Sequence, residues 1–332
     1  MKDISHYSLL PHNTFGIDVK CKRFIEYNSI EELRSCLPSI IKEPLLHIGS
    51  GSNLLFTKDF EGTILHSGIK GKEILSAQDG SVTLKVGAGE EWDSFIGWCV
   101  NEGYYGLENL SYIPGEVGAS AIQNIGAYGT EVEQYIEAVE TIEIATGKER
   151  IFSHDECQYG YRKSIFKAEL KNRFIITYVH YKLSSSFVPN LTYGALQKDI
   201  FNKDITAKEL RDSIINIRRN KLPEPKEIGS AGSFFMNPIV SREVFNPILA
   251  HYPEMPYYEV DNKIKIPAGW MIEQCGWKGK QVGNAGVYAK QALVLVNHGG
   301  ASGQEIVKLS EKIQEDVKEK FGIEIHPEVI FI

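Results

Sequence analysis

Residues 49–54, Gly-Ser-Gly-Ser-Asn-Leu, decide whether this chain contains a Rossmann unit. They follow a short apolar run over 44–48 that predicts a buried strand, and a strand followed by Gly-x-Gly is how the dinucleotide-binding fingerprint of a Rossmann unit begins. The third glycine of that fingerprint is absent, and residues 54–62 are too short and broken for the helix that it requires. A Rossmann unit is therefore excluded here. Two interpretations stay open: a loop whose backbone N–H groups bind phosphate, or a plain hairpin turn.

A second glycine pair, Gly87-Ala-Gly89, does precede a predicted helix. That helix opens with Glu90, Glu91 and Asp93, whose charges suit a helix N-terminus but would repel a pyrophosphate. We therefore interpret these glycines as structural.

Hydrophobic periodicity outlines the remaining elements. Helices and strands alternate irregularly, which favours an α+β fold over a regular α/β wind. The Leu222-Pro-Glu-Pro225 segment ends one predicted helix and marks a candidate domain boundary. The predicted helices cover 91–101, 207–221, 267–277 and 302–321, and the predicted strands cover 44–48, 63–65, 81–86, 137–144, 174–183, 292–296 and 323–332.

Composition excludes several classes of protein. The 332 residues carry a formal charge of −7, which argues against a nucleic-acid binder that tracks phosphates. The five cysteines are scattered and the nine histidines lack ligand spacing, so we expect neither a disulfide framework nor a metal site. No apolar run is long enough for a signal peptide or a membrane helix. We expect a cytoplasmic protein with reduced cysteines and without nucleic-acid or membrane partners.

The segment 111–129 is a long run of turn-forming and small residues without a clear period. An irregular loop of this length is either functional or disordered, and this one is too apolar for disorder. Its glycines would let the backbone lie against a flat ligand, while Gln123 and Asn124 read ring edges and Tyr128 stacks on a base. The alternative is a loop of small residues that serves only packing.

Three further residues are candidates for catalysis. Ser233 lies in Gly-Ser-Ala-Gly-Ser-Phe-Phe-Met-Asn-Pro, residues 229–238, where small residues allow close approach and two phenylalanines make the surroundings apolar. Arg162 stands between aromatic residues and suits a bidentate carboxylate. Glu328 lies inside an apolar predicted strand, where a carboxylate is costly unless it is paired or poised. Taken singly, the alternatives are a structural turn, a surface ion pair and an edge-facing glutamate.

Eight segments, taken together and in order, resemble the UDP-N-acetylenolpyruvoylglucosamine reductases of bacterial peptidoglycan synthesis, which are also called UDP-N-acetylmuramate dehydrogenases. The Leu-Thr-Tyr-Gly segment is similar to the subtype in which a tyrosine loop closes over the substrate. The matching segments are GSGSNLL (49–55), IPGEVGASAIQNIGAYG (113–129), YGYRKSIFK (159–167), LTYG (191–194), KLPEP (221–225), GSAGSFFMNP (229–238), AGWMIEQCGWKG (268–279) and PEVIFI (327–332).

The resemblance implies an FAD-binding part of the vanillyl-alcohol-oxidase type in two subdomains, 1–70 and 71–221, and an α+β UDP-sugar domain over 222–332. It implies non-covalent FAD, NADPH as co-substrate, and a protein that we expect to be a monomer. Residue by residue, it assigns catalysis to Ser233, Arg162 and Glu328. It assigns FAD binding to Ser50, Gly51, Ser52, Asn53, Gly115, Gly118, Gln123, Ile125 and Tyr128, and UDP-sugar binding to Tyr193, Lys221, Asn237, Lys278 and Gln291. Met236 and Ala119 depart from the family pattern, which puts only local contacts in doubt.

The reaction implied by the resemblance is the reduction of an enolpyruvyl ether. NADPH reduces FAD and leaves, and the flavin then delivers hydride to the terminal vinyl carbon. Arg162 stabilises the negative charge that develops, Glu328 shares or supplies a proton, and Ser233 protonates the adjacent carbon. Because a serine hydroxyl is a weak acid, we expect a nearby cation to assist it, and Lys221 is our candidate.

Three rival functions follow from the same residues. A serine hydrolase would use Ser233 as nucleophile, but Phe235 stands where the G-x-S-x-G elbow has glycine. A flavin oxidase often holds FAD covalently through His or Cys, and residues 111–129 contain neither. A silent nucleotide-binding sensor would not need Ser233, Arg162 and Glu328 together.

Overall fold

The computed structural model describes residues 1–192, 196 and 204–332, so the predicted substrate residue Tyr193 lies outside the described residues. Internal contacts divide the chain into two compact units. Unit 1 comprises Met1–Tyr7, Lys20–Ser50 and Phe60–Arg218, and unit 2 comprises Ser8–Val19, Gly51–Asp59 and Arg219–Ile332. One boundary between the units falls inside the glycine loop, between Ser50 and Gly51.

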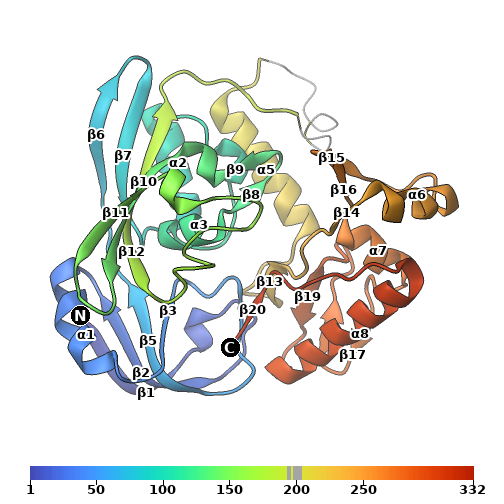
Figure 1. Cartoon of the computed structure of the whole chain (residues 1–332), viewed down its shortest axis with the longest axis horizontal. Helices are drawn as coiled ribbons and strands as arrows, with labels where there is room; N and C mark the ends of the chain where they lie inside the picture. Colours follow the sequence, from blue (N-terminus) through green and yellow to red (C-terminus); the bar gives the residue numbers. More distant parts are fainter. Residues whose placement is uncertain (193–195, 197–203) are drawn as a thin grey trace. The chain divides into compact units, whose positions relative to one another are not determined.

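A four-stranded sheet with the order β1-β2-β5-β3 forms one layer of unit 1 (Figure 1). Its central strand β5 pairs in parallel with both β2 and β3. Helix α1 packs against this sheet through Leu33, Leu37 and Ile40, which are buried with Ile25 and Leu65 of the strands. The elements are β1 (Lys2–Ser8), β2 (Lys20–Tyr27), α1 (Ile30–Ile40), β3 (Leu45–Ile48) and β5 (Phe60–Ser67).

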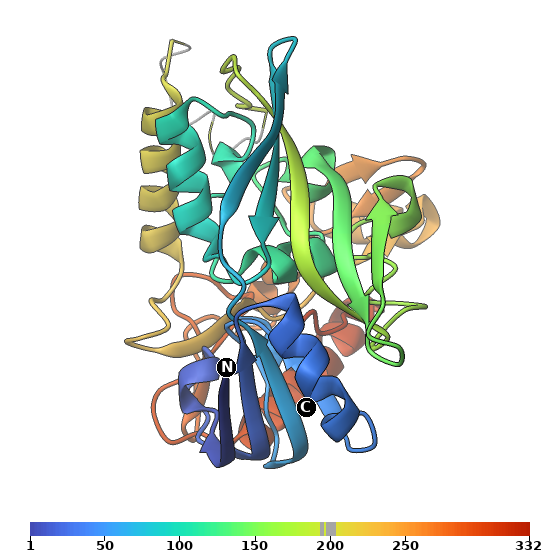
Figure 2. The same cartoon turned by 90° about the vertical axis from the view of Figure 1, so that its left-hand side faces the viewer.

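A five-stranded antiparallel sheet, β11-β10-β12-β7-β6, forms the second layer of unit 1. Helix α2 buries Trp92 and Phe95 against Tyr181 of β12. Figure 2 shows α2 and α5 side by side next to this sheet. The elements are β6 (Lys72–Gln78), β7 (Ser81–Gly87), α2 (Trp92–Glu102), β8 (Gly126–Ala127), β9 (Thr130–Glu131), β10 (Ile136–Glu143), β11 (Glu149–Ser153), β12 (Phe174–Ser184) and α5 (Ala207–Lys221).

The prediction of an irregular loop over 111–129 is partly wrong, because helix α3 (Val117–Gln123) forms inside this segment. Backbone packing explains this short helix. The amide of Gly118 donates to the carbonyl of Ala88 at 2.8 Å, and a methyl group at position 118 would come within 2.9 Å of the Ala88 methyl. A seven-residue helix is not stable by its own propensity, so tertiary contacts rather than a sequence period create it.

Unit 2 contains a four-stranded sheet, β13-β19-β18-β17, a three-stranded sheet, β14-β16-β15, and the short parallel pair β4 and β20. Helix α8 begins with a capping box formed by Ser302 and Glu305 and buries the predicted stripe from Ile306 to Phe321. The elements are β4 (Leu54–Leu55), β13 (Gly229–Ser233), β14 (Ile239–Val240), α6 (Arg242–His251), β15 (Tyr258–Val260), β16 (Lys263–Lys265), α7 (Ala268–Gln274), β17 (Gln281–Val282), β18 (Ala285–Val287), β19 (Val294–Asn297), α8 (Gly303–Phe321) and β20 (Ile330–Phe331).

The strand predicted over 323–332 is also too long, since β20 covers only Ile330–Phe331. The preceding carbonyls bind elsewhere: Ile325 accepts from the Gln314 side chain at 2.7 Å, and His326 accepts from the Met236 amide at 2.9 Å. Glu328 therefore lies in a bend just before the strand, not within it. The α+β class itself is confirmed. Among the described residues, no helix has the length and apolar character to cross a membrane.

Candidate active site

The Gly49–Asn53 loop has a backbone that admits only glycine at its centre. Gly51 has a φ of +70°, and a methyl group there would overlap the carbonyl oxygen of His12. The loop leads into the two-residue strand β4 rather than a helix, which confirms that this is not a Rossmann unit.

Ser50 in this loop carries a buried hydroxyl that forms no hydrogen bond with any described residue. Burying such a group without a partner costs about 1–3 kcal/mol, so native structures rarely leave one without a role. That the Gly49–Asn53 loop binds phosphate through its backbone stays a prediction. Asn53 behaves differently: its side-chain amide donates to the carbonyl of Glu328 at 3.2 Å, and its own carbonyl accepts from the amide of Ile330 at 3.0 Å. Asn53 thus fixes the C-terminal segment, while its neighbour Ser52 lies in the turn before it.

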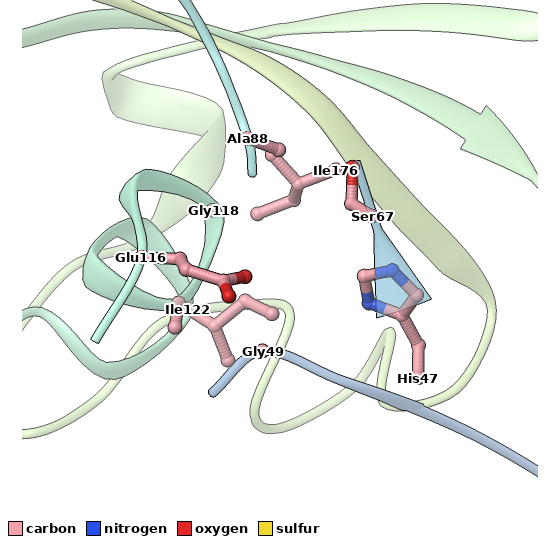
Figure 3. A pocket seen from close by; sticks show the side chains of 9 residues that line it. His47, Gly49, Ser67, Ala88, Glu116, Gly118, Ile122 and Ile176 are labelled. Atoms are coloured by element: carbon pink, nitrogen blue, oxygen red, sulfur yellow. The ribbon is translucent and has the colours of Figure 1, made fainter. Parts of the chain in front are cut away.

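A pocket with about 310 Å³ of empty space, part of it open to solvent, lies in unit 1 between β3, β5 and α3. Figure 3 shows the carboxylate of Glu116 reaching into this pocket from the α3 side, with the ring of His47 across from it. The walls elsewhere are small or apolar: Gly49, Ser67, Ala88, Gly118, Ala119, Ile122 and Ile176. The pocket therefore lies between Gly49 of the predicted phosphate loop and the predicted flavin loop.

His66 lies between two carboxylates, one of which belongs to Glu116 in the pocket wall. Its Nδ1 is 2.9 Å from Glu26 Oε2, and its Nε2 is 2.9 Å from Glu116 Oε1. Burial by itself would lower the pKa of His66, but the hydrogen bonds and charges of Glu116 and Glu26 outweigh it and raise the pKa. His47 behaves oppositely, because burial lowers its pKa to about 3, and Tyr27 Oη lies 2.8 Å from its Nε2.

The predicted flavin-loop residues divide into backbone and side-chain roles. Gly115 has a φ of +145° and accepts from the Trp92 amide at 3.0 Å. Gln123 accepts from Lys167 Nζ at 2.8 Å, so this amide is oriented by a lysine. The amide of Ile125 donates to Ser120. Tyr128 has a φ of +50°, and its carbonyl accepts from Asn109 at 2.9 Å.

Arg162 is held by the same loop. Its two terminal nitrogens donate to the carbonyls of Asn124 at 3.3 Å and Gly126 at 2.8 Å, and its guanidinium lies 5.3 Å from the centre of the Tyr161 ring. The φ of Arg162 is +55°, an unusual backbone conformation for a residue with a side chain. Such strain concentrates at functional sites.

Within unit 2, Ser233 and Glu328 belong to adjacent segments. Ser233 is exposed at the end of β13, and the amide of Glu328 donates to the carbonyl of Phe234 at 2.8 Å. Phe234 and Phe235 are fully buried and contact each other edge to face. The chain continues from Ser233 in extended form and not as a helix, so the strand–serine–helix elbow of α/β-hydrolases is absent at this serine.

Two of the predicted substrate residues, Asn237 and Gln291, each lie near the start of α7. Asn237 Oδ1 accepts from the amide of Ala268 at 2.9 Å, and Gln291 accepts from the Leu293 amide at 3.3 Å, with its Oε1 beside Gly269. Lys278 pairs with Glu273 at 2.9 Å. Lys221 is exposed at the end of α5.

The sequence interpretation missed Glu116, His66, His47 and Lys167 as parts of the site. Glu116 and Lys167 lie within the matching segments 113–129 and 159–167, but their roles were not predicted, because the partners Lys167–Gln123 and His66–Glu116 are 44 and 50 residues apart. His47 and His66 lie in strands, and a single histidine within a strand does not by itself indicate a functional site.

The residues of unit 1 around the pocket and the predicted flavin loop fit FAD. The pocket wall carries the small residues Gly49, Ala88, Gly118 and Ala119, and Lys167 orients the nearby Gln123 amide, so these residues would hold the cofactor. The carboxylate of Glu116 suits a sugar hydroxyl rather than a phosphate, because a hydroxyl can donate a hydrogen bond to it.

Comparisons with known proteins identify the family of the chain. A family model described as "FAD binding domain" matches residues 22–153, and one described as "UDP-N-acetylenolpyruvoylglucosamine reductase, C-terminal domain" matches residues 224–332. A crystal structure of UDP-N-acetylenolpyruvylglucosamine reductase from Thermus caldophilus has the same fold, with a TM-score of 0.71, 21% identity, and coverage of 99% of this chain and 98% of that chain.

Curated relatives match over nearly the whole chain. A UDP-N-acetylenolpyruvoylglucosamine reductase of Bacteroides fragilis strain YCH46 is 54% identical, over 98% of this chain and 99% of that protein. Proteins of the same name from Flavobacterium johnsoniae (46% identical, 98% of each chain) and Pseudomonas putida (42% identical, 97% of this chain and 96% of the relative) are also similar. At this identity and coverage, the chain belongs to the UDP-N-acetylenolpyruvoylglucosamine reductase family.

Proposed function

We propose that the chain uses NADPH and FAD to reduce UDP-N-acetylenolpyruvoylglucosamine to UDP-N-acetylmuramate, a peptidoglycan precursor. Family membership makes it a flavin-dependent oxidoreductase. The observation that carries the finer proposal is the hydrogen bond from the Glu328 amide to Phe234, which ties a carboxylate-bearing segment to the residue after an exposed Ser233. When bound, FAD supplies the hydride transfer from NADPH to the vinyl carbon of the substrate.

Ser233 is the proposed proton donor. Its hydroxyl is exposed at the end of β13, while the buried Phe234 and Phe235 anchor the segment behind it. A serine hydroxyl gives up a proton only to a strongly basic acceptor, and the carbon next to the substrate carboxylate becomes such an acceptor after hydride addition. Lys221 is the proposed cation that assists this transfer.

Arg162 and Glu328 are the proposed partners for the developing charge. Bonds to the carbonyls of Asn124 and Gly126 orient the Arg162 guanidinium before substrate enters. A preorganised donor of this kind contributes roughly two to three orders of magnitude in rate. Glu328 would share a proton with the substrate carboxylate. A nucleotide-binding sensor would need none of these three residues in these positions.

FAD and the UDP-sugar are proposed to bind to different parts of the chain. Residues 1–70 and 71–221 hold FAD, and 222–332 hold the UDP-sugar. The FAD residues are Ser50, Gly51, Ser52, Asn53, Gly115, Gly118, Gln123, Ile125 and Tyr128, and the UDP-sugar residues are Tyr193, Lys221, Asn237, Lys278 and Gln291. The enzyme is proposed to act in the cytoplasm as a monomer with small-molecule substrates only.

An anaerobic two-step titration tests this function. The purified protein should carry yellow, non-covalent flavin that NADPH bleaches. Addition of UDP-N-acetylenolpyruvoylglucosamine should then restore the oxidised spectrum in stoichiometric amounts. If the flavin bleaches but the sugar nucleotide leaves it reduced while oxygen restores it, the reductase proposal is wrong and an oxidase is favoured.

A further inference from the structure

The carboxylate of Glu116 has one oxygen that the protein itself does not use. Its Oε1 lies 2.9 Å from His66 Nε2, while no described residue forms a hydrogen bond with its Oε2. Because Nδ1 of His66 lies 2.9 Å from Glu26, the histidine is held from behind and orients the Glu116 carboxylate. The Glu116 side chain keeps 13% of its surface exposed, and Figure 3 shows its carboxylate reaching into the pocket of unit 1. This carboxylate is therefore oriented, only half paired and accessible to a ligand.

Gly49 keeps this oxygen uncovered. A methyl group at position 49 would lie 3.1 Å from Glu116 Oε2, closer than most contacts of a methyl group in proteins. Gly49 does not have a positive φ, so its backbone conformation does not by itself require glycine. Gly118 and Ala119 in the same wall are also small. All residues that line the pocket belong to unit 1, so the site does not depend on how the two units are arranged.

The charges around the pocket decide which kind of ligand group fits this oxygen. The described residues of the lining include no lysine or arginine, and His47 is neutral at physiological pH because burial lowers its pKa to about 3. The charge of His66 is already shared between Glu116 and Glu26. A phosphate in the pocket would thus meet a carboxylate without a compensating cation in the lining. The group that suits Oε2 is a neutral donor, since a carboxylate accepts hydrogen bonds and donates none.

FAD carries neutral donors of two kinds: hydroxyls on the two sugar chains that flank the diphosphate, and N–H groups on the two ring systems. Gly49, beside Oε2, is the first residue of the predicted phosphate loop, and sugar hydroxyls lie nearer to a diphosphate than ring N–H groups do. We propose that Glu116 is a further cofactor-binding residue whose Oε2 accepts a hydrogen bond from a sugar hydroxyl of FAD, on the ribose or on the ribityl chain. This rests on the FAD of the family and is independent of the roles proposed for Ser233, Arg162 and Glu328.

The test is FAD binding by the apoprotein, followed by flavin fluorescence, without turnover. Glu116→Ala removes the acceptor, and we expect FAD affinity to fall about 10- to 100-fold, the usual contribution of a hydrogen bond to a charged group. Glu116→Gln keeps an acceptor without the charge and should lose only about three- to tenfold on the same reasoning.

Glu140→Ala is the matched control. Glu140 also pairs with a histidine, since its Oε1 lies 2.7 Å from His180 Nε2, and its side chain is shielded from solvent nearly as well as that of Glu116. It does not line the pocket. Its substitution should therefore leave FAD affinity unchanged.

Two FAD analogues identify the hydroxyl that binds. One contains dideoxyadenosine and lacks the ribose hydroxyls, and the other lacks the hydroxyls of the ribityl chain. The natural protein should bind one of them about 10- to 100-fold more weakly than FAD, and Glu116→Ala should bind FAD and that same analogue with nearly equal affinity.

Unaltered FAD affinity in Glu116→Ala would overturn the proposal. An equal loss for FAD and for both analogues would overturn it too, because that loss would come from a structural defect or from a contact with a ring N–H group. Neither result depends on turnover of the UDP-sugar, so failure of the proposed reaction is distinguishable from failure of this assignment. Should Glu116→Ala not fold by circular dichroism, Glu116→Gln takes its place, with the smaller loss expected.

Discussion

The amide nitrogen of Glu328 donates a 2.8 Å hydrogen bond to the carbonyl oxygen of Phe234, the residue that follows Ser233. Residues 94 positions apart in the sequence are thereby fixed as neighbours within unit 2. Asn53 bonds to the carbonyl of the same Glu328 at 3.2 Å. The segments that carry the proposed proton donor, its proposed carboxylate partner and Asn53 therefore share one hydrogen-bonded framework within unit 2.

Ser233→Ala should reduce turnover of the UDP-sugar by about 10²- to 10⁴-fold, the usual contribution of a positioned proton donor. Reduction of the flavin by NADPH should continue at the natural rate, because no proton from Ser233 enters that half-reaction. Stopped-flow absorbance of the two half-reactions measures both rates. Ser241→Ala, which removes a hydroxyl that makes no capping bond, is the control. Equal loss of both half-reactions would show that Ser233 is structural.

Arg162→Lys should lower kcat by about 10²- to 10³-fold, because a lysine cannot reproduce the two-nitrogen contact with Asn124 and Gly126. Steady-state kinetics with FAD saturating provides the measurement. The control is Arg150→Lys, whose exposed guanidinium pairs with Glu156 and should change neither kcat nor KM. A kcat within threefold of the natural enzyme would remove Arg162 from the proposed mechanism.

Gly51→Ala should destabilise the protein strongly and abolish FAD binding, since the new methyl group would overlap the His12 carbonyl. Gly16→Ala is the control, because it introduces the backbone strain of a positive φ without the steric clash. Gly16 has a similar φ of +65° but open space around it, so its substitution should cost only about 1–2 kcal/mol. Chemical denaturation of both variants measures the difference. Equal costs would mean that strain alone, not the close approach, requires glycine at position 51.

His66→Gln should change how stability depends on pH. The pKa of His66 is raised in the folded protein above its ordinary value of 6.5, with Glu116 and Glu26 outweighing burial. The stabilisation from the charged histidine is therefore complete below about pH 6.5 and is lost as pH rises through the folded-state pKa.

Urea denaturation at pH 6 and pH 9 tests this sign. The natural protein should exceed His66→Gln in unfolding free energy by more at pH 6 than at pH 9. Ser241→Ala, which changes no titratable group, is the control and should show no such pH-dependent difference. A larger gap at pH 9 would contradict the ion-pair assignment.

Part of the fold was predictable because its signals are local. The stripe from Ile306 to Phe321 predicted α8, and the periodic run before Pro223 predicted α5 with its observed bounds. The broken sequence after Gly49–Asn53 excluded a Rossmann unit, as β4 confirms. The elements that failed, α3 and the C-terminal strand, owe their form to backbone contacts with Ala88, Gln314 and Met236 that no local period encodes.

The sequence by itself determined which residue types the site has: the ordered segments around Ser50, Arg162, Ser233 and Glu328 identify the family, because their glycine, serine and charge patterns are chemically restrictive. The tertiary structure alone decided how they are supported. The His66–Glu116 pair and the Lys167–Gln123 contact involve partners tens of residues apart. Their burial, and with it their pKa shifts and unmet hydrogen bonds, exists only once distant segments have packed together.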